Sequence, residues 1–226
     1  MSAATTEAPA APPPVRDAAT VVVLRDAAAR PRVLMGQRGA AAAFMPSKFV
    51  FPGGAVDPGD ASILLAVPPT PECATRLGPG ATALAAAAIR ELWEETGLPL
   101  GRPGTWAGAI PPDWAGFAAR GLVPDGEGLR FIFRAITPPG RPRRFDARFF
   151  LIDADRLAAD ADDFSAASEE LAHLQWVPLD EARRFDLPFI TEVVLAEVAA
   201  LAAGEPLDSV PFFDNSGPAP VFSRID

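Results

Sequence analysis

The chain has 226 residues, a hydrophobic content of 49% and a formal net charge of −9. This composition suits one generous domain with a packed core and excludes a disordered protein. The acidic balance argues against a basic nucleic-acid-binding surface, so we expect no nucleic-acid partner. The single cysteine, Cys73, and the single histidine, His173, argue against a disulfide within the chain and against a cysteine- or histidine-based metal site.

Residues 1–16 are small, polar and rich in proline, and no basic stretch precedes an apolar one. We therefore expect a flexible leader rather than a signal peptide. No apolar run approaches the roughly 18 residues of a membrane-spanning helix. These features predict a cytoplasmic protein with no membrane partner.

The first half of the chain predicts a β-hairpin followed by a short strand. Residues 19–24 and 31–37 are apolar runs separated by a turn at 25–30. Residues 49–51 form a further apolar strand that the sequence Pro-Gly-Gly ends. Five prolines interrupt residues 57–80, which we interpret as an inserted surface loop with one helical turn at 61–66.

The second half predicts helices alternating with strands. A helix at 82–95 begins with Thr82 as N-cap and stops before Gly97. A short helix is expected at 112–121, and an apolar-sided helix at 188–203. The expected strands are 129–136, 144–152 and 174–177. This order predicts an α+β fold, with a mixed sheet between helices in a single domain at 17–204 and a turn-rich tail at 205–226 packed on the surface.

Three carboxylates share one side of the helix predicted at 82–95. At about 100° per residue, Glu91, Glu94 and Glu95 fall within a sector of roughly 100°. Arg90 lies one turn before Glu94, at the spacing of a helical ion pair. The opposite side of the helix is apolar and contains Ile89, Leu92 and Trp93.

This placement is unfavourable for a helix that is only structural. The three acids repel one another and lie at the C-terminal end, where the helix dipole disfavours negative charge. Divalent cations would relieve both effects, because hard oxygen ligands are those that Mg²⁺ prefers. The alternative is a solvated acidic surface. The residues around the cluster favour metal binding.

Residues 90–98 read Arg-Glu-Leu-Trp-Glu-Glu-Thr-Gly-Leu. They match the second half of the Nudix box, R-E-U-x-E-E-x-G-U with U aliphatic, at every specified position. The Phe-Pro-Gly-Gly at 51–54 resembles the strand-to-loop entry of the same family, and residues 176–182 resemble a common C-terminal Nudix element. The resemblance spans roughly residues 19–203. It implies a Nudix-type α/β/α sandwich and a metal-dependent hydrolase that cleaves a diphosphate bond.

Two features depart from the family pattern. The full box reads G-x5-E-x7-R-E, so a glutamate is expected eight residues before Arg90, where this sequence has Thr82. The glycine pair also lies well over thirty residues before Arg90. An insertion at 57–80 would explain both departures, and residues 80–82 would then form the start of the helix. The missing glutamate motivates an alternative, a catalytically silent Nudix-fold module that binds nucleotides, but retention of the three helix carboxylates favours an enzyme.

The resemblance implies a metal site for Mg²⁺ or Mn²⁺. Glu91 and Glu95 would be the main ligands, and Glu94 would supply a third carboxylate directly or through water. The backbone carbonyl of Gly53 is a further expected ligand, because a glycine pair allows close approach of the chain.

The catalytic candidates are Glu94, Arg90 and Glu170. A general base must reach the attacking water, and either Glu94 or a loop acid could do so. Among the loop acids, Glu169 and Glu170 precede the strand at 174–177. The alternative is an ordinary exposed turn. Arg90 is expected to orient Glu94.

Residues 33–38, 44–46, 51–54 and 57–60 resemble the branch that includes coenzyme A diphosphatases, in particular the acyl-CoA type, which also has an insertion inside the box. The signature of that branch has an arginine where this chain has Ala43, and a glycine where it has Ser47. ADP-ribose, NADH and nucleotide sugars are the alternative substrates. The expected partner is a small nucleoside diphosphate derivative, and a homodimer is left open.

Three residues are candidates for substrate binding. Arg38 has a guanidinium that suits a phosphate, although it could equally be a surface arginine that ends a strand. Gly54 belongs to the glycine pair at the entry of the box. Arg144, with Arg141 and Arg143, could meet a nucleotide phosphate or form a solvated basic turn.

Overall fold

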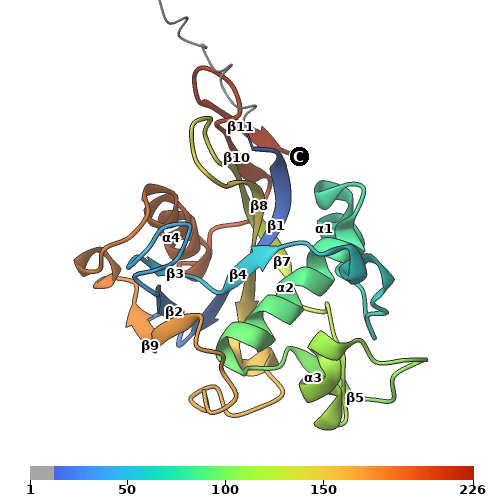
Figure 1. Ribbon diagram of the computed structural model, residues 1–226. Coiled ribbons are helices and arrows are strands. Elements are labelled where there is room, and N and C mark those ends of the chain that lie inside the picture. Colours follow the sequence, from blue (N-terminus) through green and yellow to red (C-terminus); the bar gives the residue numbers. More distant parts are fainter. Residues whose placement is uncertain (1–12) are drawn as a thin grey trace, which may run out of the picture.

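A mixed β-sheet forms the centre of the computed structural model, which describes residues 13–226 (Figure 1). The strands are β1 (Val15–Arg25), β2 (Arg32–Arg38), β3 (Phe49–Val50), β4 (Gly53–Ala55), β5 (Gly101–Pro103), β6 (Leu122–Pro124), β7 (Arg130–Ile136), β8 (Arg144–Asp153), β9 (Leu171–Pro178), β10 (Val210–Asp214) and β11 (Val221–Ile225). The main sheet has the order β11-β10-β7-β8-β1-β2-β3, and β4 and β9 pair with β1 and β2. A small separate sheet joins β5 and β6.

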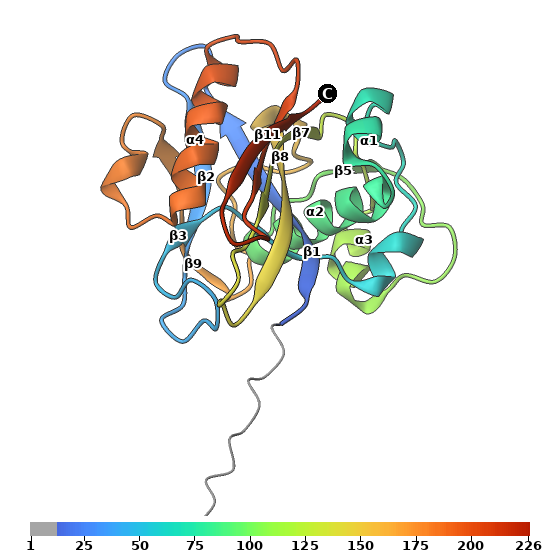
Figure 2. The ribbon, with the colours of Figure 1, turned by 90° about the horizontal axis from the view of Figure 1, so that it is seen from above.

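Helices cover both faces of the sheet. They are α1 (Pro71–Leu77), α2 (Ala81–Thr96), α3 (Ala115–Ala119) and α4 (Phe189–Ala202), with 3-10 helices at Pro58–Ser62, Pro112–Trp114, Ala154–Arg156 and Ala182–Arg184. Seen from above, α4 lies on one side of the sheet, and α1, α2 and α3 lie on the other (Figure 2). Both β1 with β8 and β7 with β10 are parallel pairs, whereas the other pairs are antiparallel. The predicted α+β fold with a mixed sheet between helices is confirmed.

Strand β1 supplies apolar side chains to both layers because successive residues point to opposite faces. Val21 and Val23 pack in the core beneath α2, whereas Val22 and Leu24 pack in the core beneath α4. Residues 85–88 of α2 are four alanines without exposed surface. Such small side chains let the helix lie close to the sheet and bring its C-terminal half against β4.

The central strand changes its partner along its length. Residues 18–20 of β1 pair with β4, whereas Leu24 and Arg25 pair with β2. On its other side β1 pairs with β8 from Val15 to Leu24. The predicted hairpin of β1 and β2 is confirmed, and β4 is a strand that the sequence pattern did not predict.

Helix α2 begins one residue earlier than predicted. Its N-cap is Gly80 in a left-handed conformation (φ 91°), and no side chain caps it. The prediction of Thr82 as N-cap was therefore wrong, because Thr82 already lies within the first turn. Gly97 ends the helix at φ 73°, as the sequence indicated.

The region at 57–80 contains more structure than a loop with one helical turn. The turn predicted at 61–66 is a 3-10 helix at Pro58–Ser62, and α1 follows at Pro71–Leu77. Thr70 caps α1 by accepting a hydrogen bond from the amide of Cys73, and a proline occupies the first turn. Proline is favoured there because its missing N–H would have no helical partner.

The C-terminal segment differs from the turn-rich tail expected at 205–226. Strands β10 and β11 form an antiparallel hairpin, and β10 extends the sheet beside β7. The turn residues at 215–220 only connect the two strands. At the other end, the predicted leader lies mostly outside the described residues, and β1 already begins at Val15.

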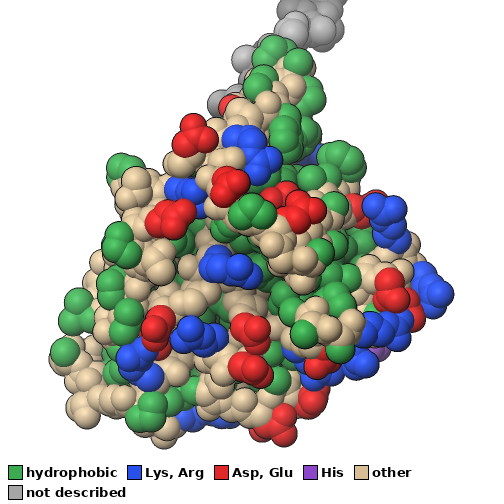
Figure 3. All heavy atoms as spheres, turned by 180° about the vertical axis from the view of Figure 1, so that it is seen from behind, with side chains coloured by type: hydrophobic (Ala, Val, Ile, Leu, Met, Phe, Trp, Pro, Cys, Tyr) green, Lys and Arg blue, Asp and Glu red, His purple; other side chains and the backbone are tan. Residues whose placement is uncertain are grey.

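In the part of the chain that the structure describes, no helix combines the length and apolar character needed to span a bilayer. On the face turned away from the view of Figure 1, acidic and basic side chains are intermingled rather than gathered in one patch (Figure 3).

Candidate functional site

Arg90 on α2 is the centre of a buried hydrogen-bond network. Its Nε and Nη2 donate to the two carboxylate oxygens of Asp60 at 2.9 and 3.0 Å. Its Nη1 donates to Glu91 Oε1 at 2.9 Å and to Glu94 Oε2 at 3.0 Å. A further bond from Nη2 reaches the carbonyl of Ala55 on β4 at 3.0 Å. Arg90 thus ties two helix carboxylates to the glycine-containing strand, and its predicted contact with Glu94 is present.

Asp60 is a site residue that the sequence analysis missed. Its side chain is 2% exposed, and its Oδ2 also accepts from the amide of Asp57 at 2.8 Å. The acid of the box was expected at Thr82, which is exposed on the first turn of α2. Asp60 follows Gly54 at the G-x5-acid spacing, so counting forward from the glycine rather than back from Arg90 would have found it.

Glu95 is the most buried of the three helix carboxylates, with 2% of its surface exposed. Its Oε2 accepts a hydrogen bond from the amide of Gly53 at 2.7 Å. Its Oε1 is buried and has no hydrogen-bond partner among the described residues. Burial raises the pKa of Glu95 well above its ordinary value, against the effect of the Gly53 amide. A buried carboxylate oxygen without a donor is costly unless a cation or a proton meets it.

Glu91 lies directly against Gly54. A Cβ at Gly54 would stand 2.5 Å from Glu91 Oε1, so a larger residue there would displace this carboxylate from its position. Burial raises the pKa of Glu91 to about 7, although Arg90 acts in the opposite direction. The pKa of Glu94 is also raised by burial and lowered in part by Arg90.

The three carboxylates are on one side of α2, as the helical spacing predicted, but they do not converge. Within residues 13–226, no group of three or more His, Cys, Asp and Glu side chains is arranged to hold a metal ion. Arg90 holds Glu91 and Glu94, and the Gly53 amide holds one oxygen of Glu95. Carboxylate oxygens are the ligands that a hard divalent cation prefers. Among the described residues Glu95 Oε1 has no hydrogen-bond partner, and burial penalises the negative charge on Glu91, so a cation would stabilise both.

A cavity of about 920 Å³ begins beside Glu91, the one helix carboxylate among its lining residues. Gly53, Gly54 and Glu91 form part of its lining, together with Glu170. Its cationic lining residues are Arg16, Arg38, Lys48, Arg141 and Arg143. Five cationic and two acidic side chains therefore face a cavity in a chain whose net charge is −9. Arg16 pairs with Asp57, Arg38 with Glu170 and Lys48 with Asp186. Arg141 and Arg143, for which the described residues give no ion pair, therefore contribute most to a positive charge that favours an anionic ligand.

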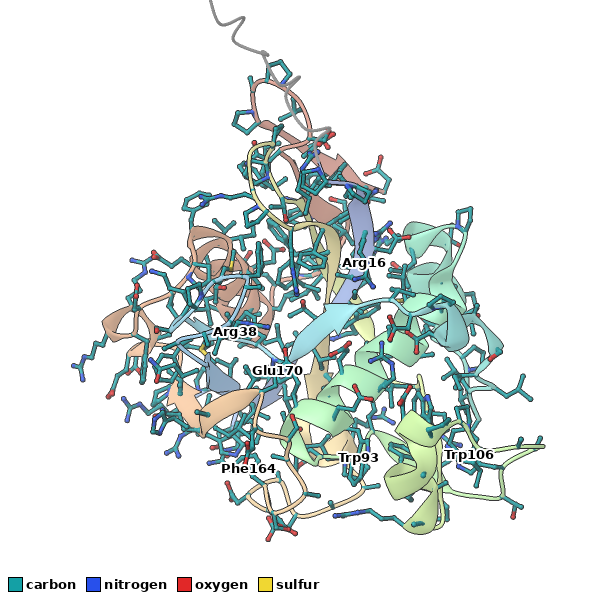
Figure 4. The ribbon with its side chains drawn as sticks, in the orientation of Figure 1. Arg16, Arg38, Trp93, Trp106, Phe164 and Glu170 are labelled. Carbon is teal, nitrogen blue, oxygen red and sulfur yellow. The ribbon has the colours of Figure 1, made fainter. Side chains whose placement is uncertain are left out.

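Arg38 and Glu170, both predicted as site residues, form an ion pair across the cavity lining. Arg38 Nη2 donates to Glu170 Oε1 at 2.9 Å, and the exposed fractions of the two side chains are 18% and 55%. Figure 4 shows both near the junction of the sheet and α2, with Arg16 farther along β1. Glu170 lies close enough to the helix carboxylates for its charge to raise the pKa of Glu91 and Glu95.

Arg144 does not line the cavity, contrary to its predicted role in binding substrate. It is buried, and its Nε donates to the carbonyl of Thr137 at 3.1 Å. Alternate residues of β8 point to opposite faces, so Phe145 faces the cavity while Arg144 points away. Its neighbours Arg141 and Arg143, in the loop before β8, do line the cavity.

Known proteins of similar structure share this fold. A crystal structure of a NUDIX hydrolase from Alicyclobacillus acidocaldarius is similar with a TM-score of 0.64 and 33% identity, and the match covers 84% of this chain and 92% of that one. A Caenorhabditis elegans Ap4A hydrolase has a similar fold, with a TM-score of 0.50 and 19% identity over 84% of this chain and 99% of that one.

A protein of Caenorhabditis elegans named as nudix hydrolase 7 is 31% identical over 158 residues, which are 65% of this chain. The match covers 46% of that relative, so the chain spans less than half of its length. The sequence model of the NUDIX domain matches residues 67–198. More than half of the sequence therefore follows the family pattern, and the chain belongs to the NUDIX domain family.

Proposed function

We propose that the chain hydrolyses the diphosphate bond of a nucleoside diphosphate derivative with the help of a divalent cation, Mg²⁺ or Mn²⁺. The observation that carries this proposal is Glu95, whose buried Oε1 has no hydrogen-bond partner among the described residues. Its Oε2 accepts from the amide of Gly53, a residue that lines the cavity. A hydrolase of this family would use Oε1 as a ligand.

Glu91 and Glu95 would hold the cation, and Glu94 and the carbonyl of Gly53 would complete its ligands. A bound divalent cation supplies charge neutralisation of the diphosphate and activation of the attacking water. Binding requires Glu91 and Glu94 to turn partly away from Arg90. Their high pKa favours this, because a cation would relieve the penalty of burying their charge.

Glu170 is the better candidate for accepting the proton of the attacking water. It lines the cavity with Glu91 and is 55% exposed, so water can reach it. Glu94 is absent from the cavity lining, and its Oε2 is engaged by Arg90. Arg38 holds Glu170 at the cavity lining through the ion pair between Nη2 and Oε1.

Arg90 acts as a positioning residue rather than by touching the substrate. All of its hydrogen bonds go to Asp60, to the carboxylates of α2 and to the Ala55 carbonyl. It thereby keeps α2 and β4 at a constant separation, so that the metal ligands and the glycine pair face the same space.

The long spacing inside the box is best explained by an insertion after Asp60. With Asp60 as the acid expected at Thr82, seven residues must remain before Arg90, so the extra residues would be 61–82 rather than 57–80. They contain α1 and end in the first turn of α2. The pair of Asp60 and Arg90 would keep the two ends of the box together despite the insertion.

For the substrate, we propose a coenzyme A derivative on the basis of the sequence resemblance at 33–60. ADP-ribose, NADH and nucleotide sugars are the alternatives, and each contains an adenosine or another nucleoside joined through a diphosphate. The lining arginines at 16, 141 and 143 suit the additional phosphate of coenzyme A.

The test is to incubate the purified protein with Mg²⁺ or Mn²⁺ and coenzyme A esters, ADP-ribose, NADH and nucleotide sugars, and to separate the products by chromatography. We expect a nucleoside monophosphate or its 3′-phosphorylated form from at least one of them. Absence of cleavage in the whole panel would contradict the proposal and favour a nucleotide-binding module without activity.

The variant Glu95→Gln assigns the activity to the site. We expect kcat/KM to fall about a thousandfold, since metal stabilisation of the transition state contributes several kcal/mol. Titration with Mn²⁺, followed by electron paramagnetic resonance, should show weaker binding. Glu72→Gln is the matched control, because Glu72 is 71% exposed on α1 and does not line the cavity.

A further inference from the structure

A row of small side chains crosses the sheet on the floor of the cavity. Ala55 on β4 pairs with Ala18 on β1, and Ala18 pairs with Ala147 on β8. Ala147 pairs with Ala135 on β7, which in turn pairs with Phe213 on β10. All five side chains line the cavity. At about 4.8 Å between neighbouring strands, the row spans about 19 Å.

Larger side chains border this row on both sides, which makes it a trough. On β8, Phe145 and Phe149 flank Ala147 at the spacing of residues that share a face. Phe44, from the loop between β2 and β3, packs edge-on against Phe145 with 5.2 Å between the ring centroids. The floor of the trough therefore consists of methyl groups, and its walls combine the aromatic rings of β8 with Arg16 and Thr20, which flank Ala18 on β1.

The two ends of the trough differ in chemistry. One end reaches Gly54 and Glu91, where the diphosphate is proposed to react. Phe213 on β10 and Phe189 at the start of α4 close the other end, with ring centroids 6.1 Å apart. Phe189 lines the cavity and is 68% exposed, so a ligand in the trough could contact its ring. A single extended molecule with one anionic and one apolar part would contact both ends.

We propose that the trough binds an extended apolar arm joined to the diphosphate of the substrate, and that Phe189 and Phe213 select for that arm. This inference rests on the proposed function for the position of the diphosphate. It makes the C-terminal hairpin, which lies beyond the matched residues 67–198, a determinant of substrate specificity.

An apolar arm fits the trough better than a sugar or a second nucleoside. Arg16 and Thr20 lie at the border of the floor on β1, but the four alanines of the floor itself have no side chain that can form a hydrogen bond. Hydroxyl groups or ring nitrogens placed there would lose water without gaining a partner, which is unfavourable. Methylene groups have no hydrogen bonds with water to lose, and their burial is favourable.

The experiment uses adenosine 5′-diphosphate esterified on its terminal phosphate with ethyl, butyl, hexyl or octyl groups. Only the length of the apolar arm changes along this series. Equilibrium binding to the full-length protein is measured by calorimetry with EDTA present, so that no hydrolysis occurs. Hydrolysis of the same esters and of ADP-ribose is measured separately with Mn²⁺.

We expect Kd to fall at least about tenfold from the ethyl to the octyl ester, since each buried methylene contributes favourably. In Phe189→Ser this dependence on length should shrink to less than about threefold. Phe222→Ser is the matched control, because Phe222 is 58% exposed on the same hairpin and does not line the cavity. It should retain the full dependence.

The outcomes separate the inference from the proposed function. Hydrolysis of ADP-ribose with a Kd that is independent of ester length would overturn the inference and leave the proposed function intact. Binding that depends on length without hydrolysis of any ester would support the inference and contradict the proposed function. Equal loss of length dependence in Phe189→Ser and Phe222→Ser would overturn the role of the trough.

Discussion

The two ends of the cavity are built in opposite ways. At the polar end, Arg90, Asp60 and Glu91 are connected by charged hydrogen bonds, and most of these groups lie on one helix and the segment just before it. At the apolar end, the alanine row and Phe213 come from five strands, and strand register alone brings them together. The polar end is therefore sensitive to the loss of a single charged group. The shape of the apolar end depends instead on the small size of the alanine side chains.

On this view the polar end would carry the reaction, whereas the apolar end would select the substrate. The helix carries groups whose charge is costly to bury, which a reaction on an anion can use. The sheet supplies a surface whose shape depends on residue size. Changes at the polar end should act on stability, metal binding and turnover together, and the following predictions test that dependence from the largest expected effect to the smallest.

The largest effect should come from Asp60→Asn. The buried guanidinium of Arg90 would lose its charged partner, and the free energy of unfolding should fall by about 3 kcal/mol. Because Glu91 and Glu94 depend on Arg90, kcat/KM should also fall about tenfold to a hundredfold. Urea denaturation and steady-state kinetics measure the two effects. Asp57→Asn is the control, since Asp57 is 53% exposed and lies 3.9 Å from Arg90; similar losses in both variants would contradict the role of Asp60.

The stability of the metal-free protein should fall as the pH rises. Burial raises the pKa of Glu91 to about 7, so the folded state holds a proton that the unfolded chain releases near its ordinary pKa. The contribution is complete below about pH 4.5 and lost above about pH 7, and it amounts to about 3 kcal/mol. Denaturation in EDTA at several pH values measures it. Glu91→Gln should reduce the slope without abolishing it, because burial also raises the pKa of Glu94 and Glu95; an unchanged slope would contradict the role of Glu91.

Gly54→Ala should weaken metal binding about tenfold, comparable with loss of a group that orients a ligand. The added Cβ would stand 2.5 Å from Glu91 Oε1 and displace the end of that flexible side chain. Mn²⁺ titration gives the affinity directly. Gly59→Ala is the matched control, because a Cβ there meets no atom within 4 Å. Equal affinities in the two variants would refute the importance of the space at Gly54.

The smallest effect is expected for Thr82→Glu, which restores the family's glutamate at its usual distance from Arg90. Thr82 is exposed in the first turn of α2, and Asp60 already occupies Arg90. Stability should change by less than about 0.5 kcal/mol, as for most surface substitutions. A clear gain in kcat/KM, measured beside the wild type, would mean that Asp60 does not replace the box acid.

Much of the fold could be predicted from local patterns. The hairpin of β1 and β2, the position of α2 and its end at Gly97 follow from apolar periodicity and glycine chemistry. The hairpin of β10 and β11 could not be recognised, because its strands are short and separated by turn residues. Those strands persist because β10 pairs with β7, a contact between residues far apart in the chain.

The candidate site divides in the same manner. The shared side of Glu91, Glu94 and Glu95 and the contact of Arg90 with Glu94 follow from helical spacing. The exchange of Thr82 for Asp60 did not follow, because α1 and its flanking residues separate Asp60 from Arg90, and counting back from Arg90 leads to Thr82. Arg144 points away from the cavity because it lies on the opposite face of β8 from Phe145. Sequence alternation alone does not tell which face of the strand meets the cavity.

The sequence by itself predicted the chemistry that we propose for this protein. Nine residues on one helical segment and a glycine pair carry the carboxylates and the close approach that a diphosphate hydrolase of this family needs, and such local spacing is preserved wherever the helix forms. Only the tertiary structure decided how Arg90 is neutralised and where an apolar trough lies. Both depend on contacts between distant segments, and the trough exists because four alanines on four strands are aligned by register, which no single stretch of the chain records.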